Sequence, residues 1–283
     1  MNYPGVDILF ALNRLLLIGL CSFEMNTYLS GLFNNIAIAK LKVNKLLLEQ
    51  TCYNRPFIII PTQQGATYMG MVSFVADGNR REGYLALPES GQGKGILVLH
   101  AWWGLTDFFK SLCDQLAAEG FVAFAPDLHH GKTASTAEEA TQILERRDFP
   151  ATQATAEAGL HFLQNHSAIT GEKLSGIGFS MGAAFALLLD SVSPGSFDKI
   201  VLFYGGSGAD LSQSKSQFQC HYGENDDWEP MDNVRQMQSS NAEIYTYPGA
   251  GHWFFETDQV DHFDADAAAL AWNRALEFLR MQS

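Results

Sequence analysis

A serine flanked by two glycines is the most reactive feature that the sequence shows. Residues 178–182 read Gly-Phe-Ser-Met-Gly, after a short apolar run and before a segment rich in Ala and Leu. A serine at a sharp strand-to-helix turn has its hydroxyl lifted above the sheet edge. Glycines two positions away are expected where a side chain would collide with the neighbouring strand or helix. The pattern therefore predicts Ser180 as a nucleophile rather than as part of a chance pentapeptide.

A serine hydroxyl needs a base to take its proton, and a histidine base needs a carboxylate to orient it. His252 is the best candidate base, because it lies in a glycine-rich loop after an apolar run. Asp226 is the best candidate acid, and its place in the loop favours it over the adjacent Asp227. The order Ser180, Asp226, His252 is typical of α/β hydrolases.

A tetrahedral oxyanion needs two backbone donors. The N–H of Met181 follows the nucleophile, and the N–H of Trp102 lies in the loop after the apolar run 95–100. Of the adjacent Trp102 and Trp103, we expect one to pack and one to line the substrate pocket. The pocket is predicted to be lined by Trp103, His129, His130, Tyr204 and Trp253.

These residues need rigid elements to bring them together. From residue 71 onward, apolar runs alternate with segments of helical periodicity, which is typical of a mainly parallel sheet with helices on both faces. Two leading strands, 72–76 and 83–87, flank a turn at 77–79 and are predicted to form an antiparallel edge hairpin.

Helix starts are predicted at Thr106, at Ser135 with Glu138 as a capping box, at Pro150 and at Asp264. The intervals between the three candidate catalytic residues already contain strands and helices. They leave no room for a cap domain, so the sequence predicts a single α/β-hydrolase fold without one.

Residues 1–67 differ from this pattern and are interpreted as an N-terminal extension of a catalytic domain at 68–283. Their apolar stretch 8–23 is interrupted by Asn13 and Arg14, which leaves it too short to cross a membrane. Three interpretations remain open: a signal segment within residues 1–30, a basic amphipathic helix at 37–48, or a stretch upstream of the natural start of translation. The third is slightly favoured.

The formal net charge is −13, and residues 1–67 are slightly positive, so the catalytic domain carries the whole negative balance. Such a surface repels nucleic acid and anionic membranes, so neither is an expected partner. The four cysteines have no paired or metal-like spacing, which favours free thiols and predicts no metal site. We expect a cytoplasmic protein, with export as the alternative if residues 1–30 are a signal segment. The sequence does not indicate an oligomeric state.

Residues 71–281 resemble the dienelactone hydrolase family of α/β hydrolases. The matching segments are 74–78, 83–88, 99–105, 125–128, 178–182, Gly223 with Asp226, and 251–254. The resemblance implies a single-domain hydrolase of esters or lactones that needs no cofactor.

Three positions depart from the best-known members of that family. Ser180 replaces their cysteine nucleophile, and Ala101 replaces a glutamate just before the oxyanion-hole residue. Glu256 replaces an arginine that binds the substrate carboxylate. The serine-type branch is thus the closer likeness, and the acidic residue argues against an anionic dienelactone as substrate.

The residues and the resemblance together predict a serine hydrolase that cleaves a small carboxylic ester or lactone through an acyl-enzyme. A thioesterase or a peptidase would differ only in the shape of the pocket. The alternative from another class is a non-catalytic binding module with the same fold, and an intact set of Ser180, Asp226 and His252 argues against it.

Overall fold

The computed structural model describes residues 68–237 and 239–281. The expectations for residues 1–67, namely the separate extension, the signal segment and the amphipathic helix, lie outside the described residues.

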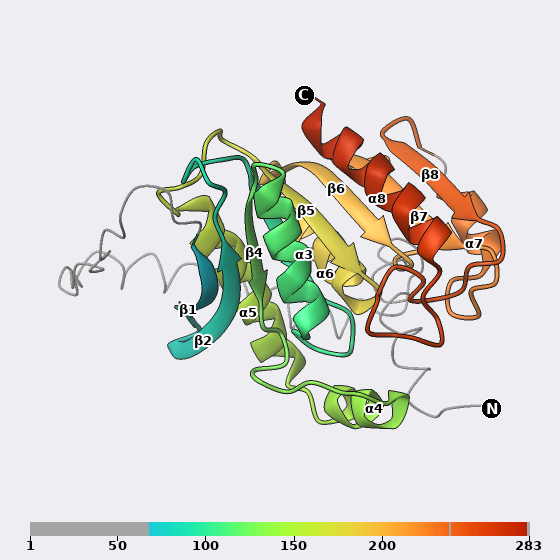
Figure 1. The fold of residues 1–283 in the computed structure, drawn as a ribbon, viewed down its shortest axis with the longest axis horizontal. Coiled ribbons are helices and arrows are strands. Elements are labelled where there is room, and N and C mark those ends of the chain that lie inside the picture. Colours follow the sequence, from blue (N-terminus) through green and yellow to red (C-terminus); the bar gives the residue numbers. More distant parts are fainter. Residues whose placement is uncertain (1–67, 238, 282–283) are drawn as a thin grey trace, which may run out of the picture. The chain divides into compact units, whose positions relative to one another are not determined.

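Eight strands form one sheet in the order β1-β2-β4-β3-β5-β6-β7-β8 (Figure 1). The neighbours from β4 to β8 are parallel, whereas β2 pairs antiparallel with both β1 and β4. This arrangement confirms the predicted α/β-hydrolase sheet with an antiparallel edge. The strand bounds are β1 Met69–Ala76, β2 Asn79–Ala86, β3 Gly95–Leu99, β4 Val122–Pro126, β5 Leu174–Phe179, β6 Phe197–Phe203, β7 Gln217–Gly223 and β8 Ala242–Tyr247.

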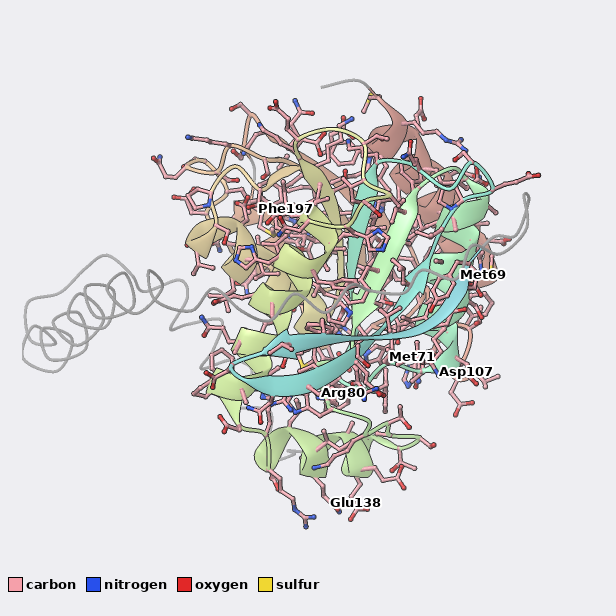
Figure 2. All side chains as sticks on the ribbon, turned by 90° about the vertical axis from the view of Figure 1, so that its left-hand side faces the viewer. Met69, Met71, Arg80, Asp107, Glu138 and Phe197 are labelled. Carbon is pink, nitrogen blue, oxygen red and sulfur yellow. The ribbon has the colours of Figure 1, made fainter. Side chains whose placement is uncertain are left out.

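The edge hairpin is longer than predicted. Asp77 and Gly78 form the two-residue turn with φ values of 48° and 73°, a conformation that suits Asp-Gly between antiparallel strands. Met69 therefore pairs with Ala86 at the far end of the hairpin. Figure 2 shows the hairpin with Met69 at that end and Arg80 near the turn.

Helices cover both faces of the sheet. In Figure 1, α3 and α8 lie in front of it, and α5 and α6 lie behind it. Accordingly α3 contacts β2 and β4, α8 contacts β7, α5 contacts β1, β3 and β4, and α6 contacts β3, β5 and β6. The helix bounds are α3 Asp107–Ala118, α4 Ala137–Glu145, α5 Phe149–Gln164, α6 Met181–Val192, α7 Met231–Gln236 and α8 Ala265–Arg280.

One predicted helix start was wrong by one residue. The cap of α4 is Thr136, whose hydroxyl accepts the N–H of Glu139, and the Glu139 carboxylate accepts the N–H of Ser135. Ser135 and Glu138 were predicted because they have the same spacing as Thr136 and Glu139, so the motif alone could not choose between them. Asp264 caps α8 as predicted, by accepting the N–H of Ala267 at 3.0 Å.

The parallel strands all end at the same edge of the sheet, and this edge collects the candidate residues. Ser180 follows β5, Tyr204 follows β6, and the loops carrying Trp102, Asp226 and His252 follow β3, β7 and β8. Between β6 and α8 the described chain holds only β7, α7, β8 and loops, so no cap helices are inserted there.

Candidate active site

Ser180 lies in a strained turn between β5 and α6. Its φ of 49° falls in the left-handed region, which is costly for a residue with a side chain. The flanking glycines are required by close packing. A Cβ on Gly178 would lie 2.5 Å from the carbonyl oxygen of Gly182, and one on Gly182 would lie 2.0 Å from that of Leu99. The turn therefore presents the serine side chain at the edge of the sheet.

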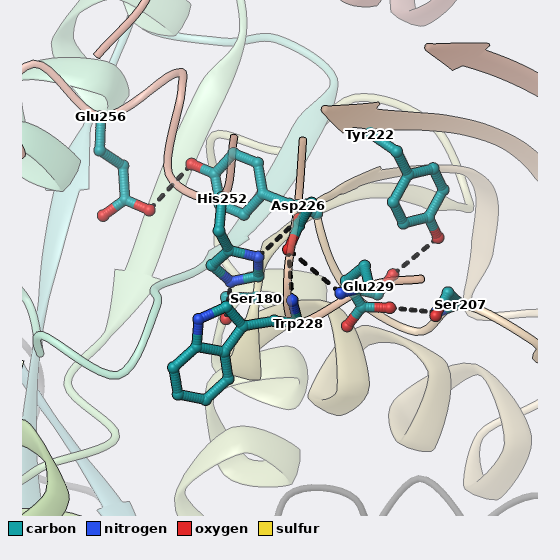
Figure 3. A network of polar contacts seen from close by, with 10 residues as sticks. Ser180, Ser207, Tyr222, Asp226, Trp228, Glu229, His252 and Glu256 are labelled. Atoms are coloured by element: carbon teal, nitrogen blue, oxygen red, sulfur yellow. Dashed lines mark hydrogen bonds and ion pairs between the residues drawn. The ribbon is translucent and has the colours of Figure 1, made fainter. Parts of the chain in front are cut away.

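The structure brings Ser180, His252 and Asp226 into one hydrogen-bonded chain (Figure 3). The Oγ of Ser180 lies 2.9 Å from Nε2 of His252, and Nδ1 of His252 lies 2.7 Å from Oδ2 of Asp226. A carboxylate only accepts, so Nδ1 carries the proton and Nε2 is free to accept from the serine hydroxyl.

Asp226 is fixed by its own loop. Its second oxygen, Oδ1, accepts the N–H groups of Trp228 at 2.8 Å and Glu229 at 3.1 Å. Asp226 is buried, whereas the neighbouring Asp227 is exposed. Of the two adjacent aspartates, Asp226 is thus the one that contacts His252.

Hydrogen bonds and a tight turn fix the loop after β3. The carbonyl of Trp102 accepts from Nε2 of His129 at 2.9 Å, and the carbonyl of Trp103 accepts the N–H of Ala134 at 2.9 Å. Gly104 allows the turn, because a Cβ there would lie 2.4 Å from the carbonyl oxygen of Lys132.

Two buried histidines, each in its neutral form, support this loop. His100 donates from Nδ1 to the carbonyl of Ala101 at 2.7 Å and accepts the N–H of Leu128 at 3.0 Å with Nε2. Burial lowers the pKa of His100 to about 4 and that of His129 to about 3. His129 was predicted to line the pocket, but its ring supports the backbone of Trp102 instead.

The N–H of Met181 belongs to the first turn of α6, where backbone N–H groups have no partner within the helix. The dipole of α6 also favours negative charge at this end. Met181 adjoins Ser180, and the start of the Trp102 loop packs against Gly182, where a Cβ would lie 2.7 Å from the carbonyl oxygen of His100. Both N–H groups therefore remain candidates for the oxyanion hole.

Four tryptophans form a cluster beside His252. Trp102 stacks on Trp253 with 5.6 Å between ring centroids, and Trp103 meets Trp253 edge-on at 5.2 Å. Trp228, which had no predicted role, lies 5.2 Å from Trp102 and 5.8 Å from the His252 ring. Both Trp102 and Trp103 are buried, and the expectation that one of them lines the substrate pocket stays a prediction.

The remaining predicted pocket residues lie apart from one another. His130 is exposed and its Nε2 lies 3.0 Å from the hydroxyl of Thr155 on α5, so it is not grouped with the others. Tyr204 is fully buried, with its ring 5.0 Å from that of His252 and its hydroxyl donating to Glu256 at 2.8 Å.

The side chain of Glu256 does not lie at the protein surface. It is fully buried, and burial raises its pKa well above the usual value of 4.5. Its second oxygen has no hydrogen-bond partner within the described part of the chain. Burial disfavours the charged form of this carboxyl group, so the argument against an anionic substrate from this residue is weakened.

Sequence reasoning missed two charged residues beside the site. Arg147, between α4 and α5, is half-buried with Nη1 3.3 Å from the sulfur of Met181, and it takes part in none of the ion pairs among the described residues. Glu229, in the loop after β7, is buried with Oε2 2.9 Å from the N–H of Ser207. Neither Arg147 nor Glu229 lies at a spacing from Ser180 that belongs to a recognised motif, so no local sequence pattern could have identified them.

Comparison with known proteins identifies the family. Residues 81–283 match the dienelactone hydrolase family. The chain belongs to this family. A relative, protein usf of Aquifex pyrophilus, is 30% identical over 226 residues, which cover 74% of this chain and 97% of that protein. A putative carboxymethylenebutenolidase of Aquifex aeolicus is 28% identical over 226 residues, with the same coverage of 74% and 97%.

The fold agrees with this membership of the dienelactone hydrolase family. A crystal structure of a putative dienelactone hydrolase from Klebsiella pneumoniae superposes with a TM-score of 0.67 at 22% identity, covering 77% of this chain and all of that one. The protein is thus a hydrolase similar to carboxymethylenebutenolidases, at distant identity. Within the described residues, no helix combines the length and apolar character needed to span a membrane.

Proposed function

We propose that this dienelactone hydrolase family member cleaves a small carboxylic ester or lactone through an acyl-enzyme on Ser180. In this mechanism the serine attacks the carbonyl carbon while His252 takes its proton at Nε2. Asp226 holds the proton on Nδ1 and stabilises the imidazolium that forms. The N–H groups of Met181 and Trp102 bind the oxyanion.

The second half of the reaction uses the same groups. His252 returns the proton to the leaving oxygen, which stays in the same molecule if the substrate is a lactone. Water then attacks the acyl-enzyme with His252 again acting as base, and Ser180 is released. The observation that carries this proposal is the hydrogen-bonded chain at 2.9 Å and 2.7 Å that starts at a strained serine.

The site also supports substrates that bear a carboxylate. The half-buried guanidinium group of Arg147 contacts the side chain of Met181, next to the proposed oxyanion hole. Glu256, the residue that argued for a neutral substrate, is buried against Tyr204. The name of the Aquifex aeolicus relative, a carboxymethylenebutenolidase, indicates a lactone with a carboxymethylene group. We therefore include carboxylate-bearing lactones in the proposed substrate class.

The test compares Ser180→Ala with Ser212→Ala, a control at an exposed serine in the loop after β6. We expect Ser180→Ala to lower kcat for an ester or lactone by roughly 10⁴-fold or more, with an unchanged fold. It should also abolish covalent labelling by a fluorophosphonate, while the control keeps both properties. Retained turnover in purified Ser180→Ala would refute the proposal, and a wild-type protein that is neither labelled nor active would favour a binding module.

A further inference from the structure

Glu229 connects two loops of the candidate site. Its backbone N–H donates to Oδ1 of Asp226 at 3.1 Å, and its side-chain Oε2 accepts the N–H of Ser207 at 2.9 Å. Figure 3 shows both contacts beside the chain from Asp226 to Ser180. A single residue thus links the loop that carries the acid to the loop that follows β6.

The loop after β6 lies directly against the nucleophile. A Cβ on Gly205 would lie 2.5 Å from the carbonyl oxygen of Ser180, so the two backbones are in close contact. The hydroxyl of Tyr222 donates to the carbonyl of Gly205 at 2.9 Å, and Glu229 holds Ser207 two residues further on. The position of segment 205–207, and with it the packing against Ser180, depends on these two contacts.

Burying a carboxylate costs free energy, and one hydrogen bond from a backbone N–H offsets only part of that cost. Burial raises the pKa of Glu229, while the bond from Ser207 and the nearby His252 favour its charged form. Asp226 acts in the opposite direction, because two carboxylates in one loop repel each other. Glu229 is therefore within electrostatic range of both His252 and its hydrogen-bond partner.

We propose that Glu229 is a positioning residue of this site. Its side-chain oxygen holds segment 205–207 against Ser180. This inference rests on the proposed serine hydrolase function.

The test uses two substitutions at the site and one control in the same loop. Glu229→Leu removes the acceptor and the charge, Glu229→Gln keeps an acceptor oxygen but removes the charge, and Glu224→Gln removes an exposed carboxylate. We expect Glu229→Leu to lower kcat by about 10- to 100-fold with little change in KM, because misplaced reacting groups slow the chemical step. Glu229→Gln should recover most of that kcat.

The split between kcat and KM, and its rescue by Glu229→Gln, separate positioning from a merely structural role. Glu224→Gln should leave kcat unchanged. Wild-type kcat in folded Glu229→Leu, or a kcat in Glu229→Gln as low as that of Glu229→Leu, would overturn the inference.

The two proposals fail in different ways. If Glu229→Leu does not fold, Glu229→Asp decides the question: its shorter side chain draws the acceptor away from the N–H of Ser207 and should lower kcat with little change in KM. If Ser180→Ala keeps its activity, the serine mechanism itself is wrong, whatever the Glu229 variants do. If Ser180→Ala is inactive and both Glu229 variants behave like the wild type, only the role of Glu229 is refuted.

Discussion

Arg147 is the residue from which the charge preference of this hydrolase can be tested. Its guanidinium group lies beside Met181 and above the ring of Phe149, 5.4 Å from the ring centroid. Burial lowers the pKa of Arg147, yet an arginine keeps its charge at neutral pH. A substrate carboxylate bound here would make a charge-assisted hydrogen bond, which contributes about 1.5–3 kcal/mol.

We therefore predict that Arg147→Gln raises KM for a carboxylate-bearing lactone by about 10- to 100-fold. KM for a neutral ester of similar size should change less than about twofold, since that ester has no charge for the guanidinium group to bind. The neighbouring Arg146 is exposed, and Arg146→Gln is the matched control. Equal losses for charged and neutral substrates would show that Arg147 supports the loop rather than the substrate.

Glu256 makes the stability of the protein depend on pH. Its pKa is raised well above 4.5 by burial, so the folded state holds this proton more tightly than the unfolded state. The free energy of unfolding therefore falls as pH rises above about 4.5, until the folded carboxyl group itself ionises. Below that pH both states are protonated and the residue contributes no pH dependence.

We predict that Glu256→Gln melts at a higher temperature than the wild type at pH 7–8, with the difference shrinking towards pH 4–5. The amide keeps an oxygen to accept from Tyr204 and cannot ionise. Thermal melts across this range measure the effect, with Asp261→Asn as an exposed control in the same loop. A Tm difference that does not vary with pH would mean that Glu256 is not the titrating group.

At the scale of the elements, the sequence predicted the strands, helices and turns that have local periodic patterns. It missed the buried polar pairs, which depend on contacts between distant segments. The buried strands β3 and β4 were visible as continuous apolar runs, and the Asp77-Gly78 turn located the hairpin. Ser180 was visible because its turn constrains the neighbouring glycines locally.

The interior polar groups could not be placed in this way. Tyr204 and Glu256 are 52 positions apart, and Ser207 and Glu229 are 22 apart. Only the order and twist of the strands bring these pairs together. A similar limit applied to His129 and His130: the sequence puts both in one loop, but only backbone geometry turns one towards Trp102 and the other towards α5.

At the scale of the whole molecule, the α/β body carries all the residues used by the proposed mechanism. Strand β1 begins at Met69, and the carbonyl of Tyr68 accepts the N–H of Leu87 just before it. The first strand of the sheet therefore needs nothing upstream of residue 68 for its pairing with β2. Whether residues 1–67 contribute to stability can be tested by removing them.

We predict that a shortened chain starting at Met69 stays in solution and keeps the kcat/KM of the full chain. A chain starting at Met71 loses the pairing of Met69 with Ala86 and should melt at a slightly lower temperature. Activity assays and thermal melts of the three chains test this. A Tm several degrees lower for the Met69 chain would show that the N-terminal residues stabilise the body.

The tryptophan cluster has a practical consequence. Four of the five tryptophans of the chain form one cluster, in which Trp228 and Trp253 contact His252, and only Trp272 lies elsewhere, on α8. Ultraviolet emission from the folded protein therefore originates mainly beside the candidate site. Because a protonated imidazole quenches a neighbouring indole, this emission should respond to the charge on His252. The protein thus carries its own optical reporter, and substrate binding or acylation could be followed in stopped-flow experiments without any added dye.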